Sequence, residues 1–176
     1  ATGAAYLTGT TSAPDFPTVG PFQTDRPSID SFVTKLNPAG NAIVYSTYLG
    51  GSEQDAAVDI AVDGGGSAYV VGVTRSADFD RVGGVEGFND SDDAFVTKLS
   101  PAGNTLVYSS FLGGGLVDSA GSVAVDAVGQ AYVAGTTDSH DFNHVGQTGP
   151  AGGTVAYDAW VAKFNTAGSA LRYSVE

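Results

Sequence analysis

Hydrophobic residues in this chain alternate with small or polar residues in short runs separated by glycine-rich segments. The clearest example covers residues 93–114, where two alternating runs flank the sequence Pro-Ala-Gly-Asn. Alternation with a period of two is typical of a β-strand with one buried face, and Gly and Asn between two such runs indicate a hairpin turn. Long windows with the 3.6-residue period of a helix are missing. The pattern therefore predicts an all-β fold of many short strands.

The same pattern recurs along the chain at a nearly constant step. Four landmarks keep one register, and they are Tyr6, Tyr69 and Tyr132; Phe16, Phe79 and Phe142; Val19, Val82 and Val145; and Asp30, Asp93 and Asp158. The first three sets step by 63 residues, and the last steps by 63 and then 65. Self-similarity at a fixed period is the signature of a repeat architecture. We therefore expect one domain, 1–176, with repeats at approximately 1–51, 52–114 and 115–176.

Each complete repeat is predicted to hold four antiparallel strands. They lie at residues 55–63, 68–74, 95–99 and 105–112 in the second repeat, and at 119–126, 131–137, 160–164 and 170–175 in the third. Four-stranded antiparallel units joined by glycine-rich segments are typical of propeller blades. Small residues at 56–58 fit a crowded inner strand near a propeller axis, whereas bulky Tyr108 and Phe111 fit the wider outer strand.

The first repeat contains only three of these strands. The prediction is therefore a propeller-type array of about three blades with 11 strands, the first blade lacking its inner strand. Closed propellers typically have about four to eight blades, and an open sheet edge favours pairing with another strand. We expect the missing strand to come from another copy of this chain, from the rest of a longer parent protein or from a partner peptide. A closed two-chain ring and an open head-to-tail filament both meet this expectation.

Several sequence runs resemble one known family. Residues 31–40 read Ser-Phe-Val-Thr-Lys-Leu-Asn-Pro-Ala-Gly, and residues 45–51 read Tyr-Ser-Thr-Tyr-Leu-Gly-Gly. With the runs at 61–63, 68–70, 11–12 and 15–17, they resemble the SBBP beta-propeller repeats of bacterial and archaeal proteins. The resemblance implies a propeller-type architecture in large secreted or surface proteins, and thus an extracellular or cell-surface location. It implies no single activity and no catalytic residues.

The charge of the chain narrows the choice of partners. The 19 acidic residues outnumber the 7 basic ones, which gives a formal net charge of −12. Such a surface repels nucleic-acid phosphates, so no nucleic-acid partner is expected. No apolar run approaches the ~20 residues of a membrane-spanning helix, so no membrane insertion is expected. The absence of cysteine excludes a disulfide framework and thiolate chemistry.

Aspartates are the main candidates for a metal site. Residues 89–93, Asn-Asp-Ser-Asp-Asp, form the densest set of oxygen donors in the chain. Calcium binds about six to eight oxygen ligands, often from alternating positions in a loop. We therefore name Asp90, Asp92 and Asp93 as candidate calcium ligands, with an ordinary solvated loop as the alternative. The Gly and Glu continuation of an EF-hand is missing.

Two further aspartates stand at the end of an inner strand. Asp63 and Asp126 each precede a turn that contains glycine. A carboxylate at this position accepts hydrogen bonds from the backbone N–H groups of the turn. We predict this capping role for both residues, with metal binding as the alternative.

One loop holds both histidines of the chain, His140 and His144, together with Ser139 and Asp141. A base, a carboxylate and a hydroxyl suggest hydrolytic chemistry, and two histidines with a carboxylate suggest zinc. Asp141 belongs to the repeated Asp-Phe landmark, which indicates a structural role, and a third firm zinc ligand is missing. We predict no catalytic residue and retain the two histidines as candidates for binding a ligand or partner.

The aromatic residues of the long loops are Phe22, Phe88 and Tyr157. Exposed aromatic rings could stack on a glycan, which makes a glycan a candidate partner. Packing beneath their own loops is the alternative. Glycine-rich runs read as turns, because no Gly-x-x-x-x-Gly-Lys phosphate motif occurs.

The sequence as a whole predicts a non-catalytic extracellular propeller-repeat module for scaffolding, adhesion or self-assembly, completed by a strand from another chain or from parent sequence. It requires no cofactor, although calcium is a candidate. The long loops that join strands two to three share one face with the joints between blades, where binding sites concentrate. A carbohydrate-binding propeller is one alternative. A fragment of a larger secreted propeller enzyme is another.

Overall fold

A computed structural model describes residues 3–24, 28–89, 91–142, 145 and 157–175. Within them the chain forms strands and no helix, so it has no helix long and apolar enough to cross a membrane. The strands are β1 (Tyr6–Thr11), β2 (Asp30–Leu36), β3 (Ile43–Leu49), β4 (Asp55–Val62), β5 (Ala68–Thr74), β6 (Asp93–Leu99), β7 (Leu106–Leu112), β8 (Asp118–Val125), β9 (Ala131–Thr137), β10 (Asp158–Phe164) and β11 (Leu171–Val175).

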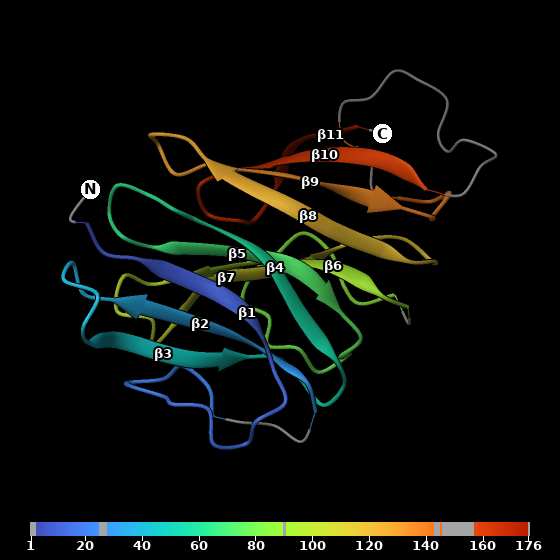
Figure 1. Cartoon of the computed structure of the whole chain (residues 1–176). Coiled ribbons are helices and arrows are strands. Elements are labelled where there is room, and N and C mark those ends of the chain that lie inside the picture. The colour runs from blue at the N-terminus through green and yellow to red at the C-terminus, as the bar shows by residue number, and fades with distance from the viewer. Residues whose placement is uncertain (1–2, 25–27, 90, 143–144, 146–156, 176) are drawn as a thin grey trace.

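The strands form three separate antiparallel sheets, ordered β1-β2-β3, β4-β5-β6-β7 and β8-β9-β10-β11. The sheets follow one another through the molecule in chain order, from blue to red (Figure 1). We call them blades 1, 2 and 3. This arrangement confirms the all-β, propeller-type prediction, including 11 strands and a first blade of three strands. The three blades do not close into a ring. Strand ends differ from the predicted ones by at most two residues, because Asp93 and Asp158 already pair with β5 and β9.

The hairpin turn between the last two strands has the same geometry in every blade. Its glycines Gly40, Gly103 and Gly168 adopt positive φ values of 69°, 71° and 67°. Each donates its backbone N–H to the carbonyl three residues earlier, at 2.9–3.1 Å. Glycine adopts this left-handed conformation without the steric cost of a Cβ. The repeated Pro-Ala-Gly-Asn or Thr-Ala-Gly-Ser sequence therefore sets the hairpin that shapes each outer half-blade.

Hydrophobic clusters between successive blades form the core. The first joins Val33, Tyr45 and Leu49 of blade 1 to the blade 2 residues Val70, Phe79, Phe95, Leu99 and Phe111. The second joins the opposite face of blade 2 to blade 3, where Trp160 and Phe164 are buried. Blade 2 thus buries one face against blade 1 and the other against blade 3, whereas blades 1 and 3 each bury one face against blade 2. This face-to-face packing of twisted sheets is what places the loops and strand edges described below.

The long loop after the second strand returns along the outer edge of its blade. Val19, Val82 and Val145 form isolated bridges to Ser46, Ser109 and Ser174, respectively. Pairing of this kind covers a strand edge that would otherwise present free backbone groups. The repeated Val-Gly landmark of the sequence therefore protects the outer edge of every blade.

The inner strands β4 and β8 are more open than the sequence suggested. We expected crowding near a propeller axis, but Val58 on β4 is 57% exposed and several neighbours are half-buried. Three blades leave the axis side open, which explains the exposure. Both strands also carry a register shift, at Ala57/Asp59 and Ala120/Ser122.

Candidate functional site

The inner strands of blades 2 and 3 each begin with a buried aspartate. Asp55 and Asp118 are fully buried. Asp55 Oδ2 accepts hydrogen bonds from Gly51 N at 2.6 Å and Ser76 Oγ at 2.9 Å. Asp118 Oδ2 repeats this arrangement with Gly114 N at 2.7 Å and Ser139 Oγ at 2.8 Å. These bonds tie the joint between two blades to the start of the next inner strand.

A second buried aspartate approaches each of these carboxylates. A Cβ placed on Gly50 would collide with the Asp30 carboxylate and lie 2.8 Å from Asp55 Oδ2. Gly113 has the same surroundings, with Asp93 in the first role and Asp118 in the second. Only glycine fits between two such carboxylates, which explains the repeated Leu-Gly-Gly sequence of the blade joints.

Burial raises the pKa of Asp55 and Asp118 above the ordinary aspartate value of 3.8. Hydrogen bonds to each carboxylate oppose this rise. Sequence reasoning did not single out Asp55 and Asp118. The available signal was an Asp four residues after the second Gly of each joint.

A different carboxylate ends the inner strand. Asp63 Oδ1 accepts hydrogen bonds from Gly65 N at 2.9 Å and Ser67 N at 3.0 Å, and Asp126 Oδ1 accepts from two turn N–H groups in the same way. The predicted turn-capping role is confirmed for both residues. Burial alone would raise the pKa of Asp63, but hydrogen bonds from Ser67 and Tyr69 and the charge of Lys98 leave it below its ordinary value.

The capping aspartate also joins a tyrosine and a lysine of its own blade. Tyr69 OH donates to Asp63 Oδ2 at 3.1 Å, and Lys98 Nζ lies 3.3 Å from the same oxygen. Lys98 Nζ also lies over the Tyr69 ring, 4.6 Å from its centroid. The Tyr69 ring reaches blade 3, because its hydroxyl hydrogen bonds with Gly129 O at 3.1 Å. The recurring tyrosine thus packs between blades, as its repetition predicted.

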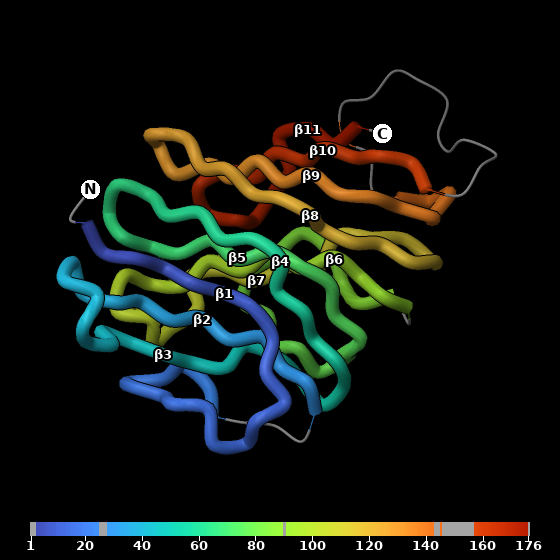
Figure 2. The backbone as a smooth tube through the Cα atoms, in the orientation of Figure 1, coloured from blue at the N-terminus to red at the C-terminus, as the bar shows by residue number. Residues whose placement is uncertain are grey.

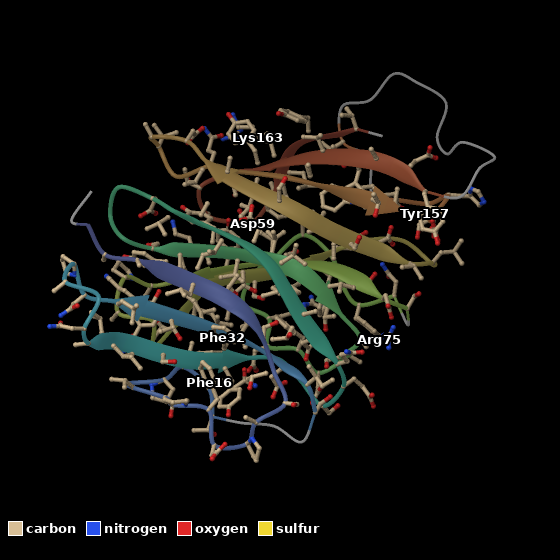
Figure 3. The ribbon with its side chains drawn as sticks, in the orientation of Figure 1. Phe16, Phe32, Asp59, Arg75, Tyr157 and Lys163 are labelled. Carbon is tan, nitrogen blue, oxygen red and sulfur yellow. The ribbon has the colours of Figure 1, made fainter. Side chains whose placement is uncertain are left out.

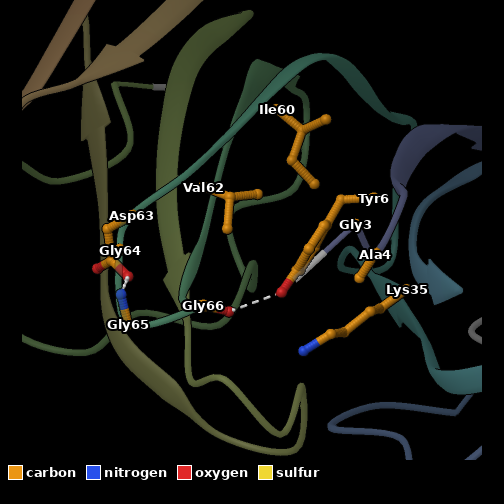
Figure 4. Close-up of a pocket in the computed structure, with 10 residues that line it drawn as sticks. All are labelled: Gly3, Ala4, Tyr6, Lys35, Ile60, Val62, Asp63, Gly64, Gly65 and Gly66. Carbon is orange, nitrogen blue, oxygen red and sulfur yellow. Dashed lines mark hydrogen bonds between the residues drawn. The ribbon is translucent and has the colours of Figure 1, made fainter. Parts of the chain in front are cut away.

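The matching position between blades 1 and 2 contains an open cavity of about 640 Å³. Gly3, Ala4, Tyr6 and Lys35 line it from blade 1, and Ile60, Val62 and the turn 63–66 line it from blade 2. Tyr6 OH donates to Gly66 O at 3.3 Å across this space, and the Lys35 side chain extends beside it (Figure 4). In the backbone trace, the β4–β5 turn lies next to the N-terminal end of β1 (Figure 2).

Blade 1 and blade 3 each present an apolar face that no other described blade covers. On blade 1, Leu7, Phe16, Phe32, Leu36 and Ile43 line a groove of about 280 Å³. Figure 3 labels Phe16 and Phe32 at this end of the molecule. On blade 3, the exposed apolar residues are Val161, Tyr173 and Val175. The equivalent residues at the internal junctions are buried, except Leu106, the equivalent of Ile43, which is partly buried.

The candidate calcium ligands do not converge in the described residues. Asp92 pairs with Arg75, whose Nε lies 2.8 Å from Oδ1. Asp93 is fully buried and accepts a hydrogen bond from Asn89 N at 2.7 Å. Asp90 lies outside the described residues. Among those that the structure describes, no group of three or more His, Asp or Glu residues is arranged to hold a metal. Calcium binding by this loop stays a prediction.

The predicted ligand-binding loop residues fall into two environments. Phe22 and Phe88 are half-buried and pack against the core between blades 1 and 2. Tyr157 is 75% exposed and precedes β10, at the same end of the blades as Arg75 (Figure 3). Its backbone N–H donates to Asp138 Oδ1 at 2.9 Å. His140 is exposed, and His144 lies outside the described residues.

The Ser139 hydroxyl, a candidate for hydrolytic chemistry, has a structural partner. Ser139 is almost fully buried, where its Oγ donates to Asp118 and accepts the N–H of Leu116 at 2.9 Å. Ser76 is placed identically in blade 2. The repetition assigns Ser139 to the joint between blades.

Comparison with known proteins relates one segment of the chain to a family of repeats. Curated proteins give no match to this chain. A family model described as a beta-propeller repeat, SBBP, matches residues 44–80, which run from β3 through β5. The matched segment contains the joint, the inner strand and the turn described above. Residues 44–80 are therefore similar to an SBBP beta-propeller repeat, and they lie within a propeller-type array of antiparallel sheets.

Proposed function

We propose that this chain is a non-catalytic propeller module of an extracellular or cell-surface protein, which acts by assembling with further blades of its own kind. Scaffolding and adhesion follow from such assembly, because a row of blades presents its long loops along one surface. Assembly takes two forms in the proposal. Copies stack through their end faces, and a strand from another chain or from parent sequence completes blade 1.

The exposed end faces carry the proposal. Leu7 on blade 1 is 43% exposed, whereas the equivalent Val70 and Val133 are fully buried by the preceding blade. Tyr173 on blade 3 is 36% exposed, whereas the equivalent Tyr108 is fully buried by the following blade. The two end faces therefore carry the residue types of the two sides of an internal junction. A blade 3 face of one copy is complementary to a blade 1 face of another.

Such a contact is heterologous, because it joins two different faces. Heterologous contacts generate a ring when the rotation between copies closes and a filament when it does not. Burial of apolar area drives the association at about 25 cal/mol per Å² removed from water.

The use of the buried polar residues supports a non-catalytic role. Ser76, Ser139, Asp55 and Asp118 form the same hydrogen bonds at two joints, and repeated positions serve the repeat rather than one site. The exposed Tyr157 is the strongest support for the glycan alternative, and one ring is too little for a stacking platform.

The assembly state tests the proposal. Sedimentation velocity across a range of protein concentrations should show species larger than one chain. Leu7→Glu and Tyr173→Glu should each reduce these species, because each places a charge on one end face. Val128→Glu is the matched control, since Val128 is exposed in the β8–β9 turn and belongs to neither end face.

A mixture of the two variants tests the head-to-tail geometry. Each variant retains one intact end face, so the mixture should form a two-chain species that neither variant forms alone. A mass of one chain at every concentration, together with a single cooperative thermal transition, would overturn self-assembly.

A further inference from the structure

A lysine, a tyrosine and an aspartate form the same cluster in blades 2 and 3. In blade 2, Lys98 Nζ and the Tyr69 hydroxyl both contact Asp63 Oδ2. In blade 3, Lys163 Nζ lies 3.9 Å from Asp126 Oδ2, and the Tyr132 hydroxyl donates to that oxygen at 3.3 Å. The aspartate always comes from the end of the inner strand, and its two partners come from the second and third strands.

In the part of blade 1 that the structure describes, the lysine and the tyrosine of this cluster are present without the aspartate. Lys35 Nζ lies over the Tyr6 ring, 5.0 Å from its centroid, as the other lysines lie over their tyrosines. Its hydrogen bond is to a carbonyl, Pro101 O, at 3.5 Å. Among the described residues no carboxylate lies within ion-pair distance of Lys35 Nζ. The described residues also form no inner strand in blade 1 of the kind that supplies the aspartate in the other blades.

The edge of β1 has space for a strand at the matching place. Gly72 and Gly135 lie against the backbone of their inner strands, where a Cβ would collide with Ala56 O or Ser119 O. The equivalent Gly9 has only the Phe32 ring within reach, at 3.0 Å. An inner strand that pairs beside this position leaves no space for a Cβ, so the position requires glycine. None of the described residues forms such a strand beside Gly9. The cavity beside Tyr6 and Lys35 lies at the end of the same edge.

We propose that the free edge of β1 and the adjoining cavity bind an inner strand of an SBBP-type repeat, antiparallel to β1, whose terminal aspartate pairs with Lys35 and the Tyr6 hydroxyl. The chemistry of the occupant is that of residues 55–63, which alternate small residues and end in Val-Asp before a glycine turn. This inference rests on the proposed completion of blade 1. It adds that Lys35 and Tyr6 favour a strand that ends in aspartate. Backbone hydrogen bonds provide affinity in such strand additions, whereas side-chain contacts provide specificity.

A peptide with the sequence of residues 53–67 is the probe. Its fluorescence anisotropy is measured with the whole chain, together with that of a second peptide carrying Asp63→Asn. The wild-type chain should bind the aspartate peptide about tenfold more tightly, which corresponds to about 1.4 kcal/mol for a partly buried charge pair. Lys35→Met should bind both peptides equally, and Lys35→Arg should restore most of the preference. Gly9→Ala should bind neither peptide, because its Cβ meets the incoming backbone.

The outcomes separate this inference from the proposed function. Equal binding of both peptides to the wild-type chain would leave strand addition in place and overturn the role of Lys35. Binding of neither peptide would overturn the inference, while the sedimentation experiment above decides separately on self-assembly. Binding that survives Gly9→Ala would also overturn it, since the peptide would then lie elsewhere.

Discussion

The junction between blades 1 and 2 and the junction between blades 2 and 3 are built from the same repeat residues, but within the described residues only the second has every strand of the repeat. Both have the apolar face contacts, the buried Asp pair beside a glycine and the tyrosine that reaches the next turn. Among the described residues, only at the second junction does the preceding blade have its inner strand, β4 of blade 2, together with the Asp63–Lys98 ion pair.

This difference separates what blade stacking needs from what blade completion needs. Stacking requires the apolar faces and the joint, and blade 1 packs on blade 2 with these alone. Completion requires Gly9, Tyr6 and Lys35, which have no equivalent partner strand among the described residues. Blade 1 therefore carries side chains suited to a contact that its own sheet does not supply.

The largest expected effect is the loss of stability on removing an aromatic ring, which should be greater on a covered blade face than on an uncovered one. Phe95 is fully buried against Phe79, with ring centroids 4.8 Å apart, whereas the equivalent Phe32 is half-buried against Phe16 at 4.6 Å. Phe95→Ala should lower the free energy of unfolding by about 4 kcal/mol, because it removes a buried ring and leaves a cavity. Phe32→Ala should cost about half as much. Urea unfolding at low protein concentration measures both, and equal losses would contradict the comparison.

The next largest effect on stability is expected at the glycine of the second strand that faces the inner strand of its blade. Gly72→Ala forces a Cβ into the backbone of Ala56 and should destabilise the chain by about 3 kcal/mol, at the upper end for overpacking. Gly9→Ala should cost less than about 1 kcal/mol, since the half-buried Phe32 ring can shift. Chemical denaturation of the two variants gives the difference. A large loss for Gly9→Ala would indicate that blade 1 already has a neighbour on that edge.

A smaller effect is expected from the lysines. Lys98→Met removes a mostly buried ion pair with Asp63 and should cost about 1–2 kcal/mol, between the values for exposed and buried pairs. Lys35→Met should change the stability by less than about 0.5 kcal/mol in the isolated chain, because the methionine retains the packing on Tyr6. Thermal unfolding measures both variants. A matching loss for Lys35→Met would mean that Lys35 already has a charged partner.

The smallest effect is in the pH dependence, where the two kinds of aspartate act in opposite directions. The pKa of Asp55 is raised by burial, so the folded chain binds more protons than the unfolded chain just above pH 3.8. Its contribution to stability is full below pH 3.8 and falls as the pH rises through the raised pKa. The pKa of Asp63 is lowered, so its contribution is full above pH 3.8 and is lost as the pH falls.

Substitution of each aspartate isolates its contribution. Asp55→Asn should flatten the decline of the melting temperature on the neutral side of pH 3.8, and Asp63→Asn should flatten the loss on the acid side. Melting temperatures of the wild-type chain and both variants across this range provide the measurement. Unchanged pH profiles in both variants would show that other carboxylates dominate.

Much of the architecture could be predicted because its signals are local. The Ala-Gly turn sequence and the alternating runs predicted the hairpins, and Asp63 before its turn predicted a cap. The candidate sites were harder to predict. The spacing from Gly51 marks Asp55 as a repeated position, but it does not show that the carboxylate is buried beside Asp30. Nothing near Phe22 or Phe88 shows that their rings pack against a core formed by two blades.

The sequence by itself determined the strands, the turns, the step of 63 residues and the three strands of the first blade, because all of these depend on residues close together in the chain or on their repetition. Only the tertiary structure decided which apolar faces are covered and which aspartates are buried. It also showed that Lys35 stands in the place of Lys98 without the carboxylate. The physical reason is that these properties arise where blades meet, between residues about 60 positions apart, as in the hydrogen bond from Tyr6 to Gly66. An alternating pattern shows that a face is apolar, but only packing shows what lies against it.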